Sequence, residues 1–230
     1  MEVELGISVP LRMALIPAGE FLMGSPETEE GRYEDEGPPH RVRIAKPFYL
    51  GIYQVTQEQY EAVMGENPSF FKGAKHPVER VSWGDAAAFC RKVSEKTGET
   101  VRLPTEAEWE YACRAGEPTP WNLNDVSFKE KAWHDRNARG RTHPVGELKP
   151  NRWGLYDMHG NVCEWCQDWY GAYQAGEQTD PRGPDTGDSR VLRGGAWNSD
   201  PTHCRSALRD SLKADDRDDV AGFRVAVDVR

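Results

Sequence analysis

Two closely spaced cysteines, Cys163 and Cys166, form a C-E-W-C motif that could carry out redox chemistry or bind a metal. The pair supplies only two thiolates, whereas structural zinc requires four ligands, and the chain contains no second C-x-x-C pair. The surrounding segment is rich in tryptophan. We therefore favour two cysteines that pack as small apolar groups, with a redox or metal pair as the alternative.

The other cysteines are Cys90, Cys113 and Cys204, so the number is odd and at least one thiol stays unpaired within a single chain. Residues 1–15 contain neither a long apolar run nor a cationic leader, and no stretch approaches the roughly 18 apolar residues of a membrane helix. Because no signal peptide is visible, we expect a cytoplasmic protein with reduced cysteines and without a membrane span.

Acidic side chains change type along the chain. The last glutamate is Glu177, and the acidic residues between positions 200 and 219 are all aspartates: Asp200, Asp210, Asp215, Asp216, Asp218 and Asp219. The formal net charge is −9, and no run is rich in lysine or arginine. This composition excludes a general binder of the phosphate backbone, so we expect no nucleic-acid partner.

A single domain is expected to position these side chains, because 230 residues suffice for one sizeable core. Hydrophobic residues make up 37% and charged residues 29%, which is a globular balance. The 8 tryptophans and 22 glycines favour a loop-rich fold held together by indole packing over a helical bundle.

Three helices are predicted in the first half of the chain from their capping residues. The first begins after the N-cap residue Thr56, and the second runs from Ser82 to a stop at Gly98. The third begins at Thr105, which forms a capping box with the glutamate three residues on, and ends near Gly116.

Strands are predicted at both ends of the chain, around a long irregular middle. They cover residues 16–25, a hairpin over 40–55 interrupted at Pro47, and two late strands over 191–197 and 223–229, with loops over 27–39 and 118–188. Strands at both ends with helices early favour an α+β domain whose N- and C-terminal strands pair in one sheet.

Five motifs occur in a fixed order: I-P-A-G-E-F-L-M-G-S from Ile16, R-L-P-T-E-A-E-W-E-Y-A from Arg102, G-L-Y-D-M-H-G-N-V from Gly154, V-L-R-G-G-A-W from Val191 and G-F-R-V-A from Gly222. Together they resemble the formylglycine-generating-enzyme (sulfatase-modifying factor) family over about residues 15–227 of a single domain, 1–230. The resemblance implies a C-type-lectin-like fold with little regular secondary structure. The motifs identify a fold, and the function must be argued from the site.

The resemblance also implies where catalytic residues would lie. Enzymes of that family oxidise a substrate cysteine to formylglycine, using Cu(I) held by two cysteines shortly after the R-G-G motif. Counting from Arg193, the two positions fall on Ser199 and Cys204. A hydroxyl holds Cu(I) poorly, so we expect neither copper nor enzyme activity. Cys204 would be catalytic only if the alternative function, copper-dependent formylglycine generation, applied.

A calcium site is implied by the segment that follows Gly154. Members of the family often hold Ca²⁺ there, and by position the ligands would be the side chains of Asp157 and Glu164 and the carbonyls of Gly160 and Val162. Two carboxylates with carbonyl oxygens suit a hard cation. The alternative is that the carboxylates of Asp157 and Glu164 accept hydrogen bonds from loop amides.

The segment over residues 191–224 resembles the variable region of diversity-generating retroelement proteins, through the frame R-V-L-R-G-G-x-W-x-x-x-P-x-x-C-R-S-A-x-R and a later G-F-R. Those elements randomise adenines in asparagine codons, which can yield Asp, Ser, Thr, His, Leu or Val but never Glu, Gln or Lys. Lys213 therefore lies outside the scheme. The residues predicted to bind ligand are Trp197 of the frame and the candidate variable residues Asn198, Ser199, Asp200, Thr202, His203, Leu208, Asp210, Ser211, Asp216, Asp218, Asp219 and Val220.

Variable side chains must point to solvent, because random substitutions in a core commonly cost a few kcal/mol. We therefore expect a non-catalytic protein whose C-terminal surface binds a protein or another macromolecule. The aspartates favour a basic partner surface or Ca²⁺-assisted recognition. An ordinary aspartate-rich loop, on a structural or regulatory protein without a variable ligand, is the remaining alternative.

Overall fold

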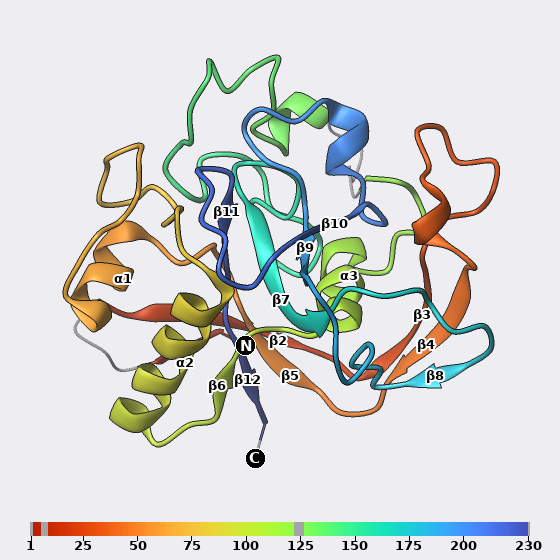
Figure 1. Ribbon diagram of the computed structural model, residues 1–230, viewed down its shortest axis with the longest axis horizontal. Coiled ribbons are helices and arrows are strands. Elements are labelled where there is room, and N and C mark those ends of the chain that lie inside the picture. Colours follow the sequence, from red (N-terminus) through yellow and green to blue (C-terminus); the bar gives the residue numbers. More distant parts are fainter. Residues whose placement is uncertain (1, 6–8, 122–126, 230) are drawn as a thin grey trace.

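The computed structural model describes residues 2–5, 9–121 and 127–229, which form three sheets and three α-helices (Figure 1). The helices are α1 (Gln57–Met64), α2 (Trp83–Thr97) and α3 (Glu106–Arg114). Short 3₁₀ turns add η1 (Glu34–Glu36), η2 (Phe128–Glu130) and η3 (Pro201–Cys204). None of the helices in these described ranges has the length and hydrophobicity of a membrane span.

The first sheet joins the two ends of the chain, as predicted. Its strand order is β1 (Glu2–Leu5), β2 (Leu11–Ile16), β5 (Phe48–Gly51), β12 (Ala226–Asp228) and β6 (Val101–Arg102). Strand β12 pairs antiparallel with β5 in a register that sets Ala226 opposite Leu50.

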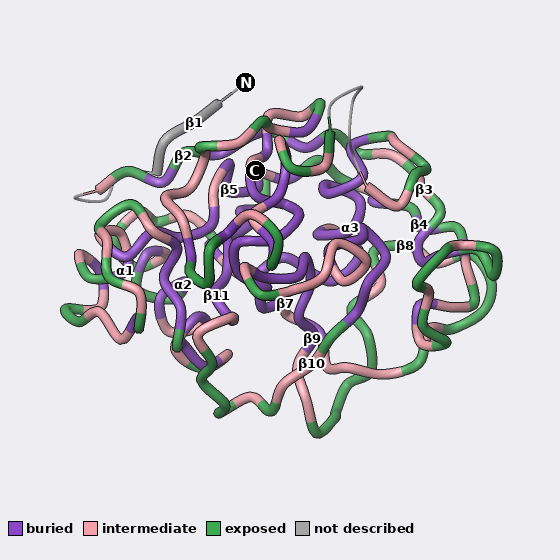
Figure 2. Tube along the Cα trace, turned by 90° about the horizontal axis from the view of Figure 1, so that it is seen from above, coloured by how far each residue is buried: buried purple, intermediate pink, exposed green. Residues whose placement is uncertain are grey.

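The second sheet occupies the middle of the molecule, with α1 and α2 on one side and α3 and the third sheet on the other (Figure 1). Its order is β10 (Arg209–Leu212), β9 (Arg190–Arg193), β7 (Cys163–Trp169) and β11 (Ala221–Gly222). The third sheet contains β3 (Gly19–Met23), β4 (His40–Ile44) and β8 (Gln178–Thr179). Strand β7 is almost wholly buried, and the segment after β10 is exposed or half-buried (Figure 2).

The predicted helices are confirmed, because local capping determines where each one begins. Thr56, Ser82 and Thr105 each cap a helix N-terminus and form a capping box. Gly98 ends α2 in the left-handed conformation, as expected. Two hydrophobic clusters result, one around Phe89 and Phe223 and the other around α3.

The strand predictions needed correction where pairing is long-range. The predicted hairpin over 40–55 is wrong, because β4 pairs with β3 and β8 whereas β5 pairs with β2 and β12. The predicted strand over 16–25 is shorter than expected: β3 covers 19–23, and β2 ends at Ile16, before Pro17. The late strands are shorter than predicted, and β9 ends where Gly194 takes a φ of 100°. Strand β7 lies within the predicted loop region and was missed.

Candidate ligand-binding site

A hollow of about 350 Å³ lies between the C-terminal end of β9 and the turn η3. We call it the C-terminal hollow. Six of the residues predicted to bind ligand line it: Asn198, Ser199, Asp200, His203, Leu208 and Asp210. Its walls are completed by Leu192, the backbone of residues 193–195, Cys163 and Asp135. The fold thus brings together side chains that the sequence places up to twelve positions apart.

The remaining predicted residues lie outside this hollow. Thr202 is in η3, where its N–H and hydroxyl bond to Asp200 Oδ1 at 2.9 Å each, and Ser211 is on β10. A second group follows β10 and contains Asp216, Asp218, Asp219 and Val220. Trp197 connects this group to the frame, because its indole N–H donates to the Asp219 carbonyl at 3.1 Å.

Solvent exposure of the predicted residues follows the expectation, with one exception. Twelve of the thirteen are exposed or half-buried, including the half-buried Trp197. Leu208 is only 6% exposed, although it lines the C-terminal hollow. A substitution of Leu208 therefore affects packing as well as the surface. This differs from the expectation that every candidate variable side chain faces solvent.

Four buried arginines hold the C-terminal segment in place. Arg193 bonds to Glu110 at 2.5 Å, and Arg209 bonds to Glu106 at 2.6 Å. Two further pairs are Arg205 with Glu36 and Arg224 with Glu164. Burial opposes the guanidinium charge, but the neighbouring carboxylates outweigh it and raise the pKa of Arg193 and Arg209. The carboxylate partners all come from outside residues 191–224.

These arginines separate the fixed frame from the exposed positions. Arg205 and Arg209 bracket Leu208 in the sequence, and both are buried, whereas Asp210 next to them is exposed. Sequence reasoning identified the frame but missed the ion pairs, because Glu36 lies in a segment that reads as a surface loop. The R-x-x-x-R spacing of Arg205 and Arg209, beside the candidate variable positions, was the sequence feature that could have indicated these ion pairs.

The resemblance places the copper-binding cysteines of the enzymes at Ser199 and Cys204, and only the second position holds a cysteine here. The hydroxyl of Ser199 accepts the Ala196 N–H at 2.9 Å. Cys204 is fully buried, and burial raises the pKa of its thiol, which therefore stays protonated at neutral pH. Ser199 supplies a hydroxyl where the resemblance places a second thiolate, and a hydroxyl fits Cu(I) poorly.

The C-E-W-C motif lies on the central strand β7, and its two cysteines belong to different clusters. Cys163 packs in the cluster around Phe89, and Cys166 packs in the cluster around α3. Burial raises the pKa of both thiols well above the usual value. The arrangement favours two packed apolar groups over a redox or metal pair.

The predicted calcium ligands converge on one point, with one difference. The carbonyl oxygens of Asp157, Gly160 and Val162 and the carboxylate of Glu164 surround the amide nitrogen of Gln54 at 3.0–3.3 Å. The Asp157 carboxylate does not bond to Gln54, and its Oδ2 accepts the Gly146 N–H at 2.8 Å. Three of the four predicted ligands, the carbonyls of Gly160 and Val162 and the carboxylate of Glu164, therefore lie together, whereas the Asp157 carboxylate accepts a hydrogen bond from a loop amide.

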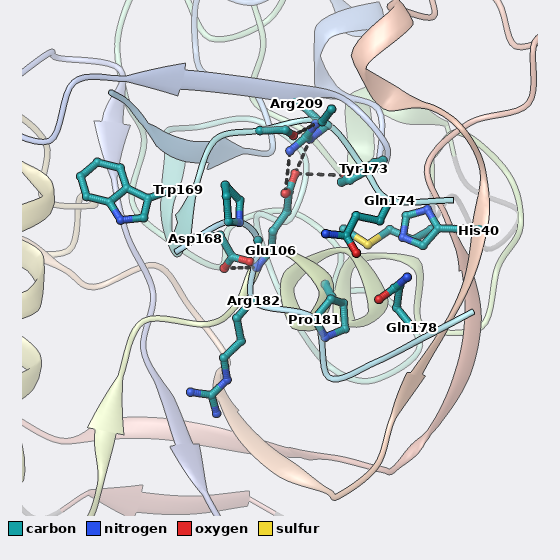
Figure 3. Close-up of a pocket in the computed structure, with 16 residues that line it drawn as sticks. His40, Glu106, Asp168, Trp169, Tyr173, Gln174, Gln178, Pro181, Arg182 and Arg209 are labelled. Carbon is teal, nitrogen blue, oxygen red and sulfur yellow. Dashed lines mark hydrogen bonds and ion pairs between the residues drawn. The ribbon is translucent and has the colours of Figure 1, made fainter. Parts of the chain in front are cut away.

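A second hollow of about 250 Å³, the Glu106 hollow, lies between the start of α3 and residues 171–184 (Figure 3). Asp168 accepts the Glu106 N–H at 2.8 Å, and burial followed by the charge of Glu106 raises the pKa of Asp168 to about 7. The Glu106 carboxylate in turn accepts from Tyr173 at 3.1 Å and from Arg209. No sequence pattern indicated this hollow.

Comparisons with known proteins agree with the motifs. Residues 8–229 match the family described as "Sulfatase-modifying factor enzyme 1-like domain". The chain is 30% identical to the formylglycine-generating enzyme of Bos taurus, covering 96% of this chain and 76% of that protein. It is 31% identical to the enzyme of the same name from Thermomonospora curvata, covering 94% of this chain and 93% of that protein.

Two solved structures are similar over almost the whole chain. Treponema denticola variable protein 1 superposes with a TM-score of 0.92 at 31% identity, covering 99% of both chains. PvdO from Pseudomonas aeruginosa superposes with a TM-score of 0.87 at 31% identity, covering 100% of this chain and 98% of that one. These likenesses confirm the predicted fold and the resemblance to a variable protein. The chain therefore belongs to the sulfatase-modifying factor enzyme 1-like family and has its C-type-lectin-like α+β fold.

Proposed function

We propose that this protein is a non-catalytic ligand-binding protein whose C-terminal surface is varied by a diversity-generating retroelement. One observation carries the proposal: six candidate variable residues line a single hollow, while the arginines between them are buried in ion pairs. Apart from the buried Leu208, positions that can change are thereby separated from positions that hold the fold. The similarity to Treponema denticola variable protein 1 supports the same function.

The charges around the hollow indicate the kind of partner. Asp135, Asp200 and Asp210 lie at its wall, and Arg136 pairs with Asp200 at 2.6 Å and with Asp135 at 3.9 Å. Hydrogen bonds from Thr202, followed by one from Arg136, lower the pKa of Asp200 to about 2, so this carboxylate stays charged. The surface therefore suits a protein or another macromolecule that presents basic or hydrogen-bond-donating groups.

Sequencing of the DNA that flanks the gene tests the proposal. We expect a reverse transcriptase gene and a template repeat whose adenines align with codons of the candidate variable residues. Differences between repeat and gene should spare Arg193, Arg205 and Arg209. Absence of such a repeat, or differences spread evenly over the frame, would remove the retroelement from the proposal and leave an ordinary family member.

Copper-dependent formylglycine generation is the second candidate function. It is favoured by the similarity to formylglycine-generating enzymes over nearly the whole chain and by the position of Cys204. The hydroxyl of Ser199 opposes it. The two candidates make opposite predictions for the conversion of a cysteine-containing peptide to its formylglycine product by the copper-loaded protein.

A further inference from the structure

Gln54 is a fully buried side chain whose amide nitrogen lies among four oxygens. It follows β5, precedes α1 and has no exposed surface. Its Nε2 atom is 3.0 Å from the Val162 carbonyl and from Glu164 Oε1, and 3.3 Å from the carbonyls of Asp157 and Gly160. We call these four oxygens the oxygen cage. Oxygens that converge on one point are the kind of ligand set that Ca²⁺ takes, and here a hydrogen-bond donor occupies that point at hydrogen-bonding distances.

The orientation of the amide follows from the cage. An amide nitrogen donates two hydrogen bonds and accepts none, so it is the end of the side chain that four acceptors attract. The reversed amide would place Oε1 against the four oxygens, an arrangement that only a bound cation would compensate. As oriented, Oε1 of Gln54 is buried and has no hydrogen-bond partner in residues 2–5, 9–121 and 127–229.

The charge of the cage does not fit a divalent cation. Its only carboxylate, that of Glu164, already accepts from the Arg224 guanidinium at 2.6 and 2.7 Å and from the Trp109 indole at 2.7 Å. Of the Asp157 carboxylate, Oδ2 accepts the Gly146 N–H at 2.8 Å and Oδ1 has no hydrogen-bond partner among the described residues, so neither oxygen bonds to the Gln54 amide. Since Glu164 and Arg224 cancel, the four oxygens carry almost no net negative charge to balance Ca²⁺.

The cage also supports the frame of the C-terminal segment. The Gly160 N–H donates to the Gly194 carbonyl at 2.7 Å, and the Trp197 N–H donates to the Asn161 carbonyl at 2.9 Å. The group that occupies the cage therefore holds residues 157–164 in place. Gly194 and Trp197 are in turn held by backbone hydrogen bonds to this segment. This link is independent of whether the C-terminal surface varies.

We propose that the Gln54 amide takes the position that a calcium ion would occupy in this oxygen cage, and that the folded protein is consequently independent of calcium. The neutral amide supplies two donors to oxygens whose net charge is already balanced. A carboxylate at position 54 would remove both donors and add a negative charge, which would convert the cage into a calcium site.

Thermal unfolding of the full chain with excess CaCl₂ or with chelator tests the proposal, together with metal analysis after dialysis. The wild-type protein should have the same Tm in both conditions and retain no calcium. Gln54→Glu should melt below wild type in chelator, and its Tm should rise by roughly 5–10 °C with calcium. Gln57→Glu is the matched control, because Gln57 is also buried and donates to the Phe71 carbonyl at 2.6 Å. It should melt lower in both conditions, without a calcium response.

Several results would overturn the proposal. A wild-type Tm that rises with calcium, or one retained calcium per chain, would mean that the cation and not the amide fills the cage. A folded Gln54→Glu protein that ignores calcium would show that the position suits no cation. If Gln54→Glu does not fold in chelator, refolding in calcium should recover it. Gln54→Met, which lacks the donors, should melt below wild type equally in both conditions, and wild-type stability of this variant would also contradict the proposal.

Discussion

The guanidinium of Arg205 and the carboxylate of Glu36 form a bidentate ion pair from which solvent is excluded. The two N–O distances are 2.5 and 2.7 Å, and neither side chain has exposed surface. Burial would raise the pKa of Glu36, but hydrogen bonds from Arg205 and Ser25 lower it overall. Arg205 also bonds to Glu29 at 2.7 Å. The pair thus anchors the C-terminal segment to a loop that lies almost 170 positions earlier in the chain.

Removal of this pair should destabilise the protein strongly. Arg205→Met leaves Glu36 and Glu29 buried without their cation, so we expect the free energy of unfolding to fall by about 3–5 kcal/mol. Arg136→Met is the matched control, because it breaks the Arg136–Asp200 pair, whose side chains are 67% and 37% exposed. That change should cost no more than about 1 kcal/mol. Urea denaturation of both variants measures the difference, and equal losses would contradict the role assigned to Arg205.

Local signals in the sequence predicted the helices, whereas long-range pairing could not be predicted. Thr56, Ser82 and Thr105 cap their helices through bonds to residues three positions on, so the necessary information is local. Strand β7 gave no alternating pattern because it is buried on both faces. The hairpin over 40–55 failed because β4 and β5 do not pair with each other: β4 pairs with β3 and β8, and β5 pairs with β2 and β12.

The candidate site, too, could be predicted from the sequence only in part. The frame and the aspartate-only composition identified six of the residues that line the C-terminal hollow. The burial of Leu208 and the pairing of Glu36 with Arg205 depend on contacts across the fold, which no spacing reveals. Gln54 was not singled out either, since its neighbours in the cage are more than a hundred positions away.

Candidate positions that are exposed or half-buried should tolerate the products of asparagine codons, and the frame should not. We expect Asp200→Asn, His203→Asn and Asp210→Ala each to change the free energy of unfolding by less than about 0.5 kcal/mol. In contrast, Gly195→Ala should cost at least about 2 kcal/mol, because the backbone strain at positive φ adds to a steric clash. Gly195 has a φ of 72°, and a Cβ there would lie 2.6 Å from Cys204 Sγ.

Leu208→Ser tests the effect of burial, because Leu208 is a candidate variable residue like the three above but is almost fully buried. The substitution should therefore cost about 2–4 kcal/mol. Chemical denaturation of the four variants and of Leu208→Ser measures all five values. A severe loss in Asp200→Asn, His203→Asn or Asp210→Ala would mean that these side chains are structural, which would favour an ordinary family member over a variable binding protein.

Formylglycine formation should be absent. The copper-loaded protein would be incubated with a cysteine-containing sulfatase-type peptide and the product read by mass spectrometry. Because Ser199 offers a hydroxyl where a second soft thiolate is required for Cu(I), we expect no aldehyde. The formylglycine-generating enzyme of Thermomonospora curvata serves as the positive control. Aldehyde formation by this protein at a rate near that of the control would restore the enzymatic function.

Stability should decrease as the pH rises through the range in which Asp157 titrates. Asp157 is 3% exposed, and burial raises its pKa from 3.8 to about 6. A carboxyl group whose pKa is higher in the folded protein binds its proton more tightly there, so its contribution to stability is fully present below about pH 4 and is lost as the pH passes about 6. Asp168, with a pKa raised to about 7, extends the same trend to neutral pH.

Asp157→Asn should remove its share of this pH dependence while keeping the local structure. Asparagine tolerates the φ of 56° at this position, and its carbonyl can still accept the Gly146 N–H. At pH 7.5 the variant should be more stable than wild type by up to about 3 kcal/mol, the equivalent of a pKa shift of roughly two units. Near pH 4 the two proteins should be equally stable. Asp185→Asn, at an exposed position, should follow the wild-type curve throughout. Urea denaturation from pH 4 to 8 measures these differences, and an Asp157→Asn curve parallel to wild type would mean that Asp157 stays ionised in the folded protein.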